Sequence, residues 1–539
     1  MRRTVARLLT AAVMLVPVAA AVAPPRTAAA DSAEPPNIIL ITTDDQSLAD
    51  LEHMPYTLEL LGGEGVRFTD AISPYPLCCP ARATILTGEQ AHNHGVLANE
   101  PPAGGYQAMR HLNDRSLPVW MSNAGYRTTF AGKYLNEYGM DDPTEVPDGW
   151  DDFHATVRHT YDYNNALVND NGEVVDHTGE YQADMTQRVT EDAIRDGVEH
   201  GHPFFIWQSN LAPHGACPLI DNQCTWGPAT PAEQDQGTFA GLPLYSESVP
   251  SFDERVVVEK PARIRRLPRF NDSLIASWRS LNQANVESLQ AVDRNVRDTV
   301  ELLRSLGQLD NTLIVFASDN GYLIGQHRWR GKTLGYEESV KIPMLMRGPG
   351  VPAGEVIDKT VSLVDVAATF ADVSGAEPLL TLDGRSLLDV VSGTSNGYDA
   401  MAIEAGPALG GVPKDQYLYR GIRTKRYTYM RHPVTGEIEL YDRAVDPYEL
   451  VNVAHRPTHR ATRFALQGLL AKLSNCVGAA CNNVVADVPD PEPAQGPVHP
   501  DELGTMGGAK QIVTVTAPRW GATHGVAVAW QKRDLTWRA

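Results

Sequence analysis

The feature that most limits the fold of this chain is a set of short, continuous apolar runs. Four such runs occupy residues 37–41, 128–131, 203–207 and 312–316. Their residues do not alternate between polar and apolar, and helical patterns separate them, which is typical of strands buried on both faces of a parallel sheet. The runs therefore predict an α/β fold with a large mixed, mostly parallel sheet flanked by helices.

Polar side chains follow each of these runs at the point where the strand would end. In the order of the runs they are Asp44 and Asp45, Lys133, His214, and Asp319 and Asn320. Ligands of open α/β sheets bind beyond the carboxyl ends of the strands. We therefore expect these side chains to meet at one edge of the sheet and to form a binding site there.

Other local patterns predict the elements around the sheet. Residues 285–306 have apolar residues at helical spacing, and Asn171-Gly172 is a typical β-hairpin turn between two short apolar runs. Residues 216–270 show no clear periodicity and predict a long irregular insertion. In the C-terminal part we expect short antiparallel strands within 420–441, a helix over 464–473, and further strands at 511–517 and 526–530.

The N-terminus has the pattern of a secretion signal. Three arginines precede an apolar stretch at 8–23, and an Ala-x-Ala cleavage site ends at Ala30. The apolar stretch is short for a membrane span and ends in two prolines. We therefore predict a cleaved signal peptide over residues 1–30 and a secreted, extracellular protein that has no membrane attachment after cleavage, with a membrane anchor as the alternative.

The six cysteines fall into three close pairs: Cys78 and Cys79, Cys217 and Cys224, and Cys476 and Cys481. Disulfides are expected in an exported protein, so we predict that the second and third pairs each close a small loop. Adjacent cysteines rarely bond to each other because the geometry is strained. Cys78 and Cys79 are therefore left unpaired.

The charge balance limits the partners of the chain. Lys and Arg number 46 and Asp and Glu number 66, so the formal net charge is −20. This excess of negative charge argues against nucleic-acid binding and against binding to an anionic membrane surface. It still permits a small anionic substrate in a local basic pocket.

The segment 78–88, CCPARATILTG, combines several features of a reactive site. Pro80 suits the first turn of a helix, with Cys78 just before the helix. A helix N-terminus favours negative charge, and Arg82 lies one turn further on. From these residues alone, Cys78 is a nucleophile, a metal ligand or a buried structural cysteine.

This segment resembles the signature of the type I, formylglycine-dependent sulfatases of the alkaline phosphatase superfamily. Their pattern C-x-P-x-R-x-x-x-L-T-G is matched by Cys78, Pro80, Arg82, Leu86, Thr87 and Gly88. The strand-end residues described above and Lys332 occur in the order that this family shows. The resemblance covers roughly residues 36–485 and implies an alkaline-phosphatase-like fold.

Changes in the sequence pattern near residues 395 and 486 predict a domain organisation. We expect a catalytic α/β domain over residues 31–395 and a smaller α+β subdomain with a short antiparallel sheet over 396–485. Residues 486–539 begin as a Pro- and acid-rich stretch, and we expect a linker and tail of unknown role there.

By this resemblance Cys78, not Cys79, is oxidised to formylglycine by a separate formylglycine-generating enzyme. The hydrated aldehyde then offers one hydroxyl to attack the sulfate sulfur, which is covalent catalysis. Deprotonation of the second hydroxyl releases sulfate and regenerates the aldehyde. Cys79 takes a variable position of the motif and is expected to be passive.

The expected metal follows from the type of ligand. Asp44, Asp45, Asp319 and Asn320 offer only oxygen, which suits Ca²⁺ or Mg²⁺ rather than zinc. The family usually uses Ca²⁺, with the modified Cys78 completing the ligand set, so we expect Ca²⁺ rather than Mg²⁺.

The resemblance assigns roles to the remaining site residues. Lys133, His214 and Lys332 would surround the sulfate and offset its charge in the transition state. Either His214 or Lys332 would protonate the leaving oxygen, Asp319 would help to deprotonate the diol, and Arg82 would orient the diol and support the metal ligands.

One departure from the family pattern indicates the substrate. Many members have a histidine two residues after the lysine of Gly-Lys, whereas Leu135 stands here, followed by Asn136. This version is similar to the N-acetylglucosamine-6-sulfatases and the extracellular endosulfatases, and it predicts 6-O-sulfated N-acetylglucosamine or related sulfated glycans as substrate. His92 and His94 have either a sugar-binding or a structural role.

Three alternatives stay open at this point. The chain is a broad arylsulfatase, a phosphonate or phosphate ester hydrolase of the same superfamily, or a calcium-bound carbohydrate-binding protein with an unmodified Cys78. Of these interpretations, a sulfatase accounts for the largest number of the residues described above.

Overall fold

The computed structural model describes residues 35–220, 223–492, 511–516, 526–533 and 536–538. The predicted signal peptide and part of the predicted tail lie outside the described residues. Among the helices that are described, none is both long enough and apolar enough to cross a membrane.

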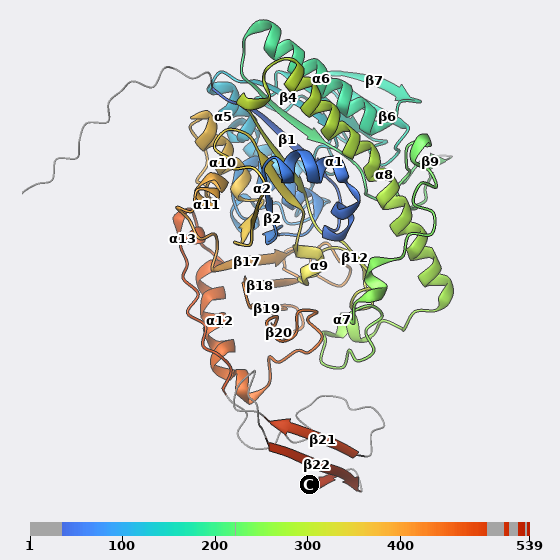
Figure 1. The fold of residues 1–539 in the computed structure, drawn as a ribbon, viewed down its shortest axis with the longest axis vertical. Helices are drawn as coiled ribbons and strands as arrows, with labels where there is room; N and C mark the ends of the chain where they lie inside the picture. The colour runs from blue at the N-terminus through green and yellow to red at the C-terminus, as the bar shows by residue number, and fades with distance from the viewer. Residues whose placement is uncertain (1–34, 221–222, 493–510, 517–525, 534–535, 539) are drawn as a thin grey trace, which may run out of the picture. The chain divides into compact units, whose positions relative to one another are not determined.

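A ten-stranded mixed sheet forms the centre of the fold (Figure 1). From one edge to the other its order is β15-β2-β14-β11-β1-β8-β4-β5-β6-β7. The five strands from β11 to β5 run parallel, and the pairs at both flanks include antiparallel ones. The bounds are β1 (Asn37–Thr43), β2 (Val66–Phe68), β4 (Arg127–Gly132), β5 (Asp152–Val157), β6 (Asn165–Asp170), β7 (Glu173–Thr178), β8 (Phe204–Ser209), β11 (Thr312–Ser318), β14 (Met344–Arg347) and β15 (Glu355–Ile357).

The four apolar runs of the sequence form β1, β4, β8 and β11, so the predicted fold class is confirmed. Strand β1 is buried along its whole length, and its alternate residues enter different cores. Ile38 and Leu40 belong to one core, while Ile39 and Ile41 belong to the other. A strand with apolar side chains on both faces is stable only when both faces are covered.

Helices cover the two faces of the sheet (Figure 1). The long helices α6 (Gln182–His200) and α8 (Asp272–Ser305) pack against each other and supply buried side chains to the core that contains Ile39. Helices α2 (Cys78–Thr87), α5 (Leu117–Asn123) and α10 (Asp365–Ser374) supply the core that contains Ile38. Helix α2 is buried on every side, so a reactive residue at its start is held in a rigid frame.

The shorter elements connect these layers. The helices are α1 (Pro55–Thr57), α3 (Ala91–His94), α4 (Gly105–Met109), α7 (Ala262–Arg265), α9 (Glu337–Val340), α11 (Leu387–Val391) and α13 (Ala479–Asn482). The short strands are β3 (Ala71–Ile72), β9 (Leu219–Ile220), β10 (Gln223–Cys224), β12 (Leu323–Ile324), β13 (Arg330–Gly331) and β16 (Val361–Ser362).

The local predictions for the first part of the chain are mostly confirmed. The hairpin between β6 and β7 turns at Asn171 and Gly172, which have φ values of 52° and 94°, as a tight turn of this type requires. Residues 216–270 contain only short elements. The helix expected from residue 285 is longer than predicted, because α8 begins at Asp272. Its added first turns continue the helical spacing of apolar residues with Trp278 and Leu281, which are buried, and the Asn271 side chain caps them by accepting a hydrogen bond from Leu274 N at 2.8 Å.

A second, antiparallel sheet of four strands follows in the C-terminal part (Figure 1). Its strands are β17 (Ala400–Ala405), β18 (Tyr419–Thr424), β19 (Tyr427–Arg431) and β20 (Ile438–Asp442), and α12 (Arg460–Leu473) shares a core with them. The sequence predicted all of these except β17. Strands β21 (Gln511–Thr516) and β22 (Val526–Arg533) were also predicted, and β23 (Thr536–Arg538) pairs with β22. The domain boundaries at 395 and 485 stay predictions.

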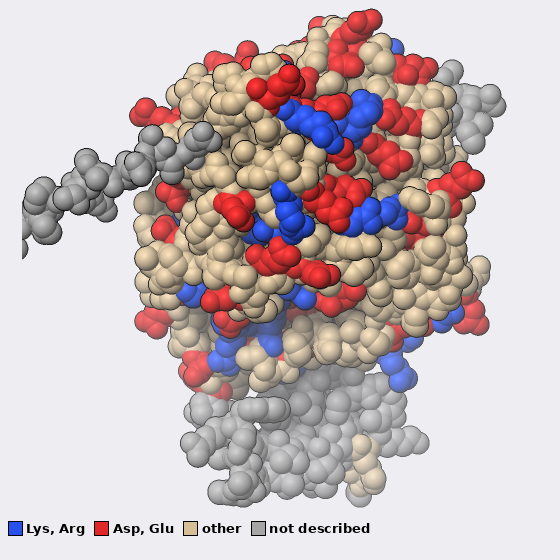
Figure 2. Space-filling view, turned by 45° about the horizontal axis from the view of Figure 1, so that its top comes forward, with Lys and Arg blue, Asp and Glu red and all other residues tan. Residues whose placement is uncertain are grey.

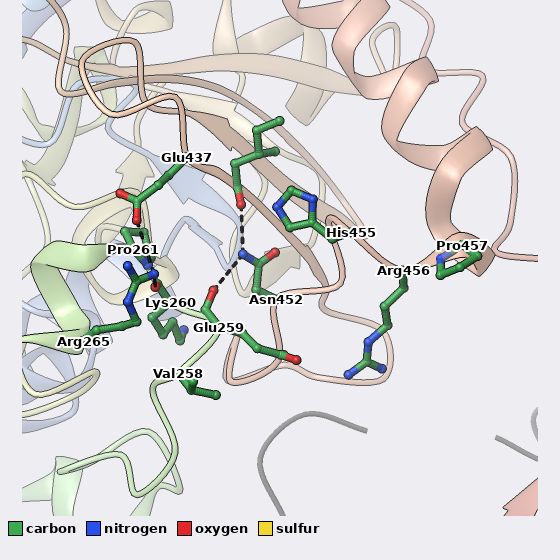
Figure 3. A pocket seen from close by; sticks show the side chains of 11 residues that line it. Val258, Glu259, Lys260, Pro261, Arg265, Glu437, Asn452, His455, Arg456 and Pro457 are labelled. Carbon is green, nitrogen blue, oxygen red and sulfur yellow. Dashed lines mark hydrogen bonds and ion pairs between the residues drawn. The ribbon is translucent and has the colours of Figure 1, made fainter. Parts of the chain in front are cut away.

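Asn452 connects the irregular insertion to the C-terminal sheet (Figure 3). Its Nδ2 donates to the carbonyl oxygens of Glu259 at 3.0 Å and Ile438 at 2.9 Å. The pocket around it has a volume of about 450 Å³ and is not lined by any of the predicted site residues. Asn452 therefore has a structural role in joining two segments.

The disulfide predictions are confirmed. Cys217 pairs with Cys224 and Cys476 pairs with Cys481, with Cα–Cα distances of 5.2 and 5.1 Å. Cys78 and Cys79 are free and buried. On the face drawn in Figure 2, acidic and basic side chains are interspersed.

Candidate active site

The carboxyl ends of the central strands bring the predicted residues together. In the register of β1 and β11, Thr43 lies beside Ser318, so Asp44 and Asp319 follow at the same level. The register of β4 and β8 places Gly132 beside Ser209, and Lys133 N donates to Ser209 O at 3.0 Å. The strand pairing therefore sets the positions of residues that are far apart in the sequence.

Cys78 is the first residue of α2, after Leu77 as N-cap. The expectation that Cys78 precedes the helix is wrong by one residue, whereas Pro80, as the third helical residue, lies in the first turn as expected. The thiol is completely buried. Its Sγ lies 3.4 Å from Asp44 Oδ1, to which it donates, and accepts from Lys332 Nζ at 2.6 Å.

Burial, together with the nearby charge of Asp44, raises the pKa of the Cys78 thiol to about 12. A thiol with this pKa stays protonated at neutral pH, and the thiolate is the form that reacts as a nucleophile. The unmodified cysteine is therefore a poor nucleophile in this place.

Arg82 holds the ends of the strands in position. Its Nε donates to Asp319 Oδ2 at 3.0 Å, and its Nη2 donates to Asp44 Oδ2 at 3.2 Å. Its Nη1 donates to Lys133 O and to Ser209 Oγ, both at 2.6 Å. The Arg82 side chain is almost completely buried. It thus contacts residues at the carboxyl ends of four strands.

The two carboxyl groups that Arg82 contacts have opposite pKa shifts. Burial by itself would raise the pKa of Asp44, but the charges of Lys133, His214, Arg82 and Lys332 hold it far below its usual range. Burial and the charge of Asp44 raise the pKa of Asp319 to about 6. The surrounding positive charges thus favour the ionised form of Asp44, whereas burial and the neighbouring charge of Asp44 favour the protonated form of Asp319.

The predicted metal ligands form one cluster. Asp45 N donates to Asp319 Oδ1 at 3.2 Å, and Asn320 Nδ2 donates to Asp45 Oδ1 at 2.7 Å. Possible ligand atoms of Asp44, Asp45, Cys78 and His214 all lie within 4.8 Å of one another.

One atom of this cluster has no partner. Asn320 Oδ1 is buried and accepts no hydrogen bond from the residues that the structure describes. A buried oxygen without a donor is costly unless something binds it. A hard cation would satisfy this oxygen together with the carboxylates, so the donor set fits Ca²⁺ or Mg²⁺.

Three basic side chains surround the cluster. Lys133 contacts Asp44, Lys332 contacts Asp45, and His214 Nε2 lies 3.6 Å from Asp45 Oδ2. Burial lowers the pKa of His214 to about 4, while the adjacent carboxylates raise the pKa of Lys133 and Lys332 above the usual value against the effect of burial. At neutral pH the two lysines are charged and the histidine is neutral.

Sequence reasoning missed several side chains at this site. The Tyr161 ring lies 4.8 Å from Lys133 Nζ and 4.8 Å from the His214 ring, and Trp226 lies 5.0 Å from Tyr161. Asn99 Oδ1 accepts from Cys79 N at 3.0 Å. These residues belong to loops without periodicity or motif, so no signal in the sequence indicated them.

The residues around the predicted motif have mainly structural contacts. His92 binds Glu404 and the Cys476 carbonyl, and His94 binds Thr84, so both histidines have structural partners. Leu135 is buried, and Asn136 Nδ2 donates to Tyr161 OH at 2.8 Å. Asn136 therefore supports Tyr161, which lies against Lys133.

Two protein families match parts of this chain. The family described as Sulfatase matches residues 36–376, and the family described as N-sulphoglucosamine sulphohydrolase, C-terminal, matches residues 325–476. A protein from Caenorhabditis elegans that is named as an extracellular sulfatase Sulf-1 homologue is 35% identical over 358 residues. These residues are 65% of this chain and 48% of that protein. The human N-acetylglucosamine-6-sulfatase is 33% identical over 365 residues, which are 65% of this chain and 63% of that protein.

The fold is also found in solved structures. A protein in complex with its substrate D-glucosamine-2-N,6-O-disulfate aligns with a TM-score of 0.67 at 22% identity, over 82% of this chain and 98% of the other. The matched region spans about half the length of the nematode relative and nearly two thirds of the human one. Because the Sulfatase family matches well over half of the described chain and the predicted residues meet at the ends of its central strands, the chain belongs to the sulfatase family.

Proposed function

We propose that this protein is a secreted sulfatase that hydrolyses sulfate monoesters of glycans, with 6-O-sulfated N-acetylglucosamine as the preferred unit. The observation that carries this proposal is the place of Cys78. It is a buried, unpaired cysteine between Lys332 and Asp44, beside a cluster of oxygen ligands with one buried oxygen unsatisfied.

Conversion of Cys78 to formylglycine is supported by the chemistry of the unmodified residue. A protonated thiol with a pKa of about 12 is neither a strong nucleophile nor a good ligand for a hard cation. Formylglycine at position 78, once hydrated, supplies an oxygen nucleophile and a second hydroxyl. The hydrogen-bonding groups for such oxygens are present, since Lys332 donates to this position and Asp44 accepts from it.

A divalent cation is supported by Asp44, Asp45, Asp319 and Asn320, with the oxygen at position 78 as a further ligand. Ca²⁺ is preferred over Mg²⁺, because a crowded set of protein oxygens suits the larger ion, whereas Mg²⁺ usually keeps several waters. When bound, the ion supplies Lewis acidity toward a sulfate oxygen. Arg82 keeps Asp44 and Asp319 in place for this role.

The basic side chains would bind the sulfate and offset its charge. Lys133 and Lys332 are charged at neutral pH and lie on two sides of Asp44 and Asp45. Fixed positive charges in a site of low dielectric stabilise the charge that develops in the transition state. His214 adds a neutral ring nitrogen at the same edge.

Two protons have to move during hydrolysis. The leaving sugar oxygen needs a proton, and Lys332 fits this role better than His214, because burial keeps His214 neutral. A base has to take the proton of the second hydroxyl at position 78, and the resemblance to the family assigns this role to Asp319.

Several observations support the proposed substrate and the proposed extracellular location. The Gly-Lys-Tyr-Leu segment is similar to that of the N-acetylglucosamine-6-sulfatases, and relatives with that name and with the name of extracellular sulfatases match the chain. Two disulfides and the predicted signal peptide fit an exported protein.

Mass spectrometry of the peptide covering residues 71–90 tests the proposal first. The expected result is replacement of sulfur by oxygen with loss of two hydrogens at Cys78, and an unchanged Cys79. The modified protein should then hydrolyse N-acetylglucosamine 6-sulfate faster than aryl phosphate or phosphonate esters. Intact thiols after co-expression with a formylglycine-generating enzyme would contradict the proposal and favour a carbohydrate-binding protein. Faster turnover of phosphonates would favour the ester hydrolase alternative.

A further inference from the structure

A histidine and two glutamates from three separate segments meet outside the proposed active site. His327, Glu338 and Glu449 each offer one possible ligand atom, and these atoms lie within 4.8 Å of one another. His327 is in the loop between β12 and β13, Glu338 is in α9, and Glu449 follows β20. The proposed sulfatase chemistry uses none of these three side chains.

Two atoms of this cluster are buried without a partner. His327 is completely buried and Glu449 is only 1% exposed. In the described part of the chain, His327 Nε2 and Glu449 Oε1 form no hydrogen bond. His327 Nε2 lies 3.7 Å from Glu338 Oε2, which is too long for a hydrogen bond. Because unsatisfied polar atoms in the interior are costly, these atoms require a further binding partner.

The contacts of the imidazole ring leave Nε2 free to bind a cation. His327 Nδ1 lies 2.9 Å from Glu254 Oε2, and the ring stacks on Tyr336 with a centroid distance of 4.0 Å. When Nδ1 donates its proton to Glu254, the lone pair is on Nε2. Histidines that bind a metal almost always donate their other N–H to a carboxylate or a carbonyl in this way.

Each glutamate is fixed through one carboxylate oxygen and leaves the other for a ligand. Glu337 N donates to Glu449 Oε2 at 2.9 Å, so Glu449 Oε1 is the free atom. Ser251 Oγ donates to Glu338 Oε1 at 3.3 Å, so Glu338 Oε2 is the oxygen that faces His327. The two carboxylates are thus held in place before any ion binds.

The charges around the cluster favour a divalent cation. Lys260 Nζ lies on the Nδ1 side of the ring, 3.2 Å from that nitrogen and 3.7 Å from Glu254 Oε2, so its charge offsets that of Glu254. Across the described ranges, neither Glu338 nor Glu449 forms an ion pair with a lysine or an arginine. Their two negative charges match the charge of one divalent ion.

A cavity beside α9 gives such an ion a route from the solvent. The cavity has a volume of about 410 Å³, and Glu338 lines it together with Gln326 and Tyr448. A buried metal site needs an entry path of this kind. The cavity also has room for a water molecule as a fourth ligand on the side of Glu338.

The ligand set indicates which ion binds. One imidazole nitrogen with two carboxylate oxygens suits Zn²⁺, which is four-coordinate in most proteins, whereas Ca²⁺ and Mg²⁺ prefer oxygen alone. Neighbouring ligand atoms of a tetrahedral zinc lie about 3.4 Å apart. The separation of 3.7 Å between His327 Nε2 and Glu338 Oε2 is close to this value.

We propose that His327, Glu338 and Glu449 bind a structural Zn²⁺ ion that joins the β12–β13 loop and α9 to the C-terminal sheet. The site is separate from the proposed Ca²⁺ cluster, and it does not depend on sulfatase activity. The loop that contains His327 continues through β13 to Lys332. The zinc ion therefore also fixes the chain segment that positions Lys332.

Zinc retention by the full-length protein tests this inference. The measurement uses Cys78→Ala in excess Ca²⁺, so that neither a thiol nor free oxygen ligands at the active site hold zinc. After incubation with Zn²⁺ and desalting, elemental mass spectrometry should find one zinc per chain. Zn²⁺ should also raise the melting temperature of this protein by a few degrees, because it binds only the folded state.

Substitutions of the ligands locate the ion. Adding Glu449→Gln or Glu338→Gln to Cys78→Ala should weaken zinc binding at least about tenfold and remove the zinc-dependent rise in melting temperature. Glu338 is partly exposed, so its substitution is the less disruptive of the two. His432→Gln is the matched control, because His432 Nε2 also contacts a glutamate, Glu439, at 2.8 Å but belongs to no such cluster. This control should retain one zinc per chain.

Two results would overturn the inference. The first is the absence of retained zinc in Cys78→Ala, which would assign His327 Nε2 to a proton shared with Glu338. The second is equal zinc retention with and without the glutamate substitutions, which would place the ion elsewhere. Neither result bears on the proposed function, since formylglycine at position 78 and sulfate ester turnover are measured separately on the parent protein.

Discussion

Lys332 Nζ donates to Cys78 Sγ over 2.6 Å, although 254 positions separate the two residues in the sequence. Lys332 also contacts Asp45, and its pKa lies well above the usual value because three carboxylates and the thiol outweigh the cost of burial. The charged ammonium group therefore lies beside the atom that is expected to react. This contact links the proposed nucleophile to the proposed proton donor.

The role of Cys78 predicts opposite results for the two adjacent cysteines. Cys78→Ala should abolish sulfate ester turnover, because it removes the thiol whose oxidation gives formylglycine. Cys79→Ala should keep the activity, since Cys79 is a buried side chain whose backbone N–H, not its thiol, binds Asn99. Steady-state turnover of a sulfated sugar checks both, with thermal unfolding as a control that the two variants fold.

The proposed donor Lys332 predicts a dependence on the leaving group. Lys332→Ala should slow hydrolysis of a sugar sulfate by about 10² to 10⁴, because an alkoxide leaves poorly without a proton. The loss should be much smaller for 4-nitrophenyl sulfate, whose phenolate leaves without protonation. Lys472→Ala on α12, with an exposed side chain, is the matched control. Equal losses for both substrates would assign Lys332 to charge neutralisation alone.

The oxygen cluster predicts stabilisation by calcium. Removal of divalent ions with a chelator should lower the melting temperature, and Ca²⁺ should restore it more fully than Mg²⁺. At a hundred times the dissociation constant the bound ion contributes about 2.7 kcal/mol to the free energy of unfolding.

A pair of asparagine variants shows whether the ion binds at this cluster. Asn320→Ala should weaken the effect of Ca²⁺, because it removes a buried oxygen that accepts no hydrogen bond from the described part of the chain. Asn311→Ala, just before β11 at the opposite end of the same strand, should respond like the parent protein. Differential scanning fluorimetry measures both, and an equal Ca²⁺ response of the two variants would place the ion elsewhere.

Asp50 predicts a pH dependence of stability that does not involve the active site. Burial raises its pKa to about 6 against the hydrogen bonds of Ser47, from 3.8 in an exposed aspartate. The folded protein therefore binds a proton between these values that the unfolded chain has lost. The contribution of Asp50 to the free energy of unfolding is largest below pH 3.8 and decreases as the pH rises toward 6, by roughly 1.4 kcal/mol for each unit of the shift.

Asp50→Asn should remove this decrease, since an amide does not ionise. Chemical denaturation of the parent and the variant between pH 4 and 7 gives the difference between them directly. Asp415→Asn, at an exposed position, is the control and should follow the parent curve. A constant difference between parent and Asp50→Asn over this range would show that Asp50 has an ordinary pKa.

The sequence alone determined the central sheet and the residues at its edge. Apolar runs such as 37–41 and 312–316 leave few structures other than buried parallel strands, because both faces of each strand need cover. The same reasoning placed Asp44 and Asp319 at one edge. The spacing of Cys78, Pro80 and Arg82 identified the reactive segment, with an error of one residue at the start of the helix.

Only the tertiary structure decided what lies around these residues. Tyr161, Trp226 and Asn99 come from loops, where no periodicity links a side chain to a position in space. The opposite pKa shifts of Asp44 and Asp319 likewise depend on which charges surround each carboxylate, and that follows from packing. Local patterns determine strands and helix starts because they depend on neighbouring residues, whereas substrate contacts and proton affinities depend on distances between residues that only the folded chain brings together.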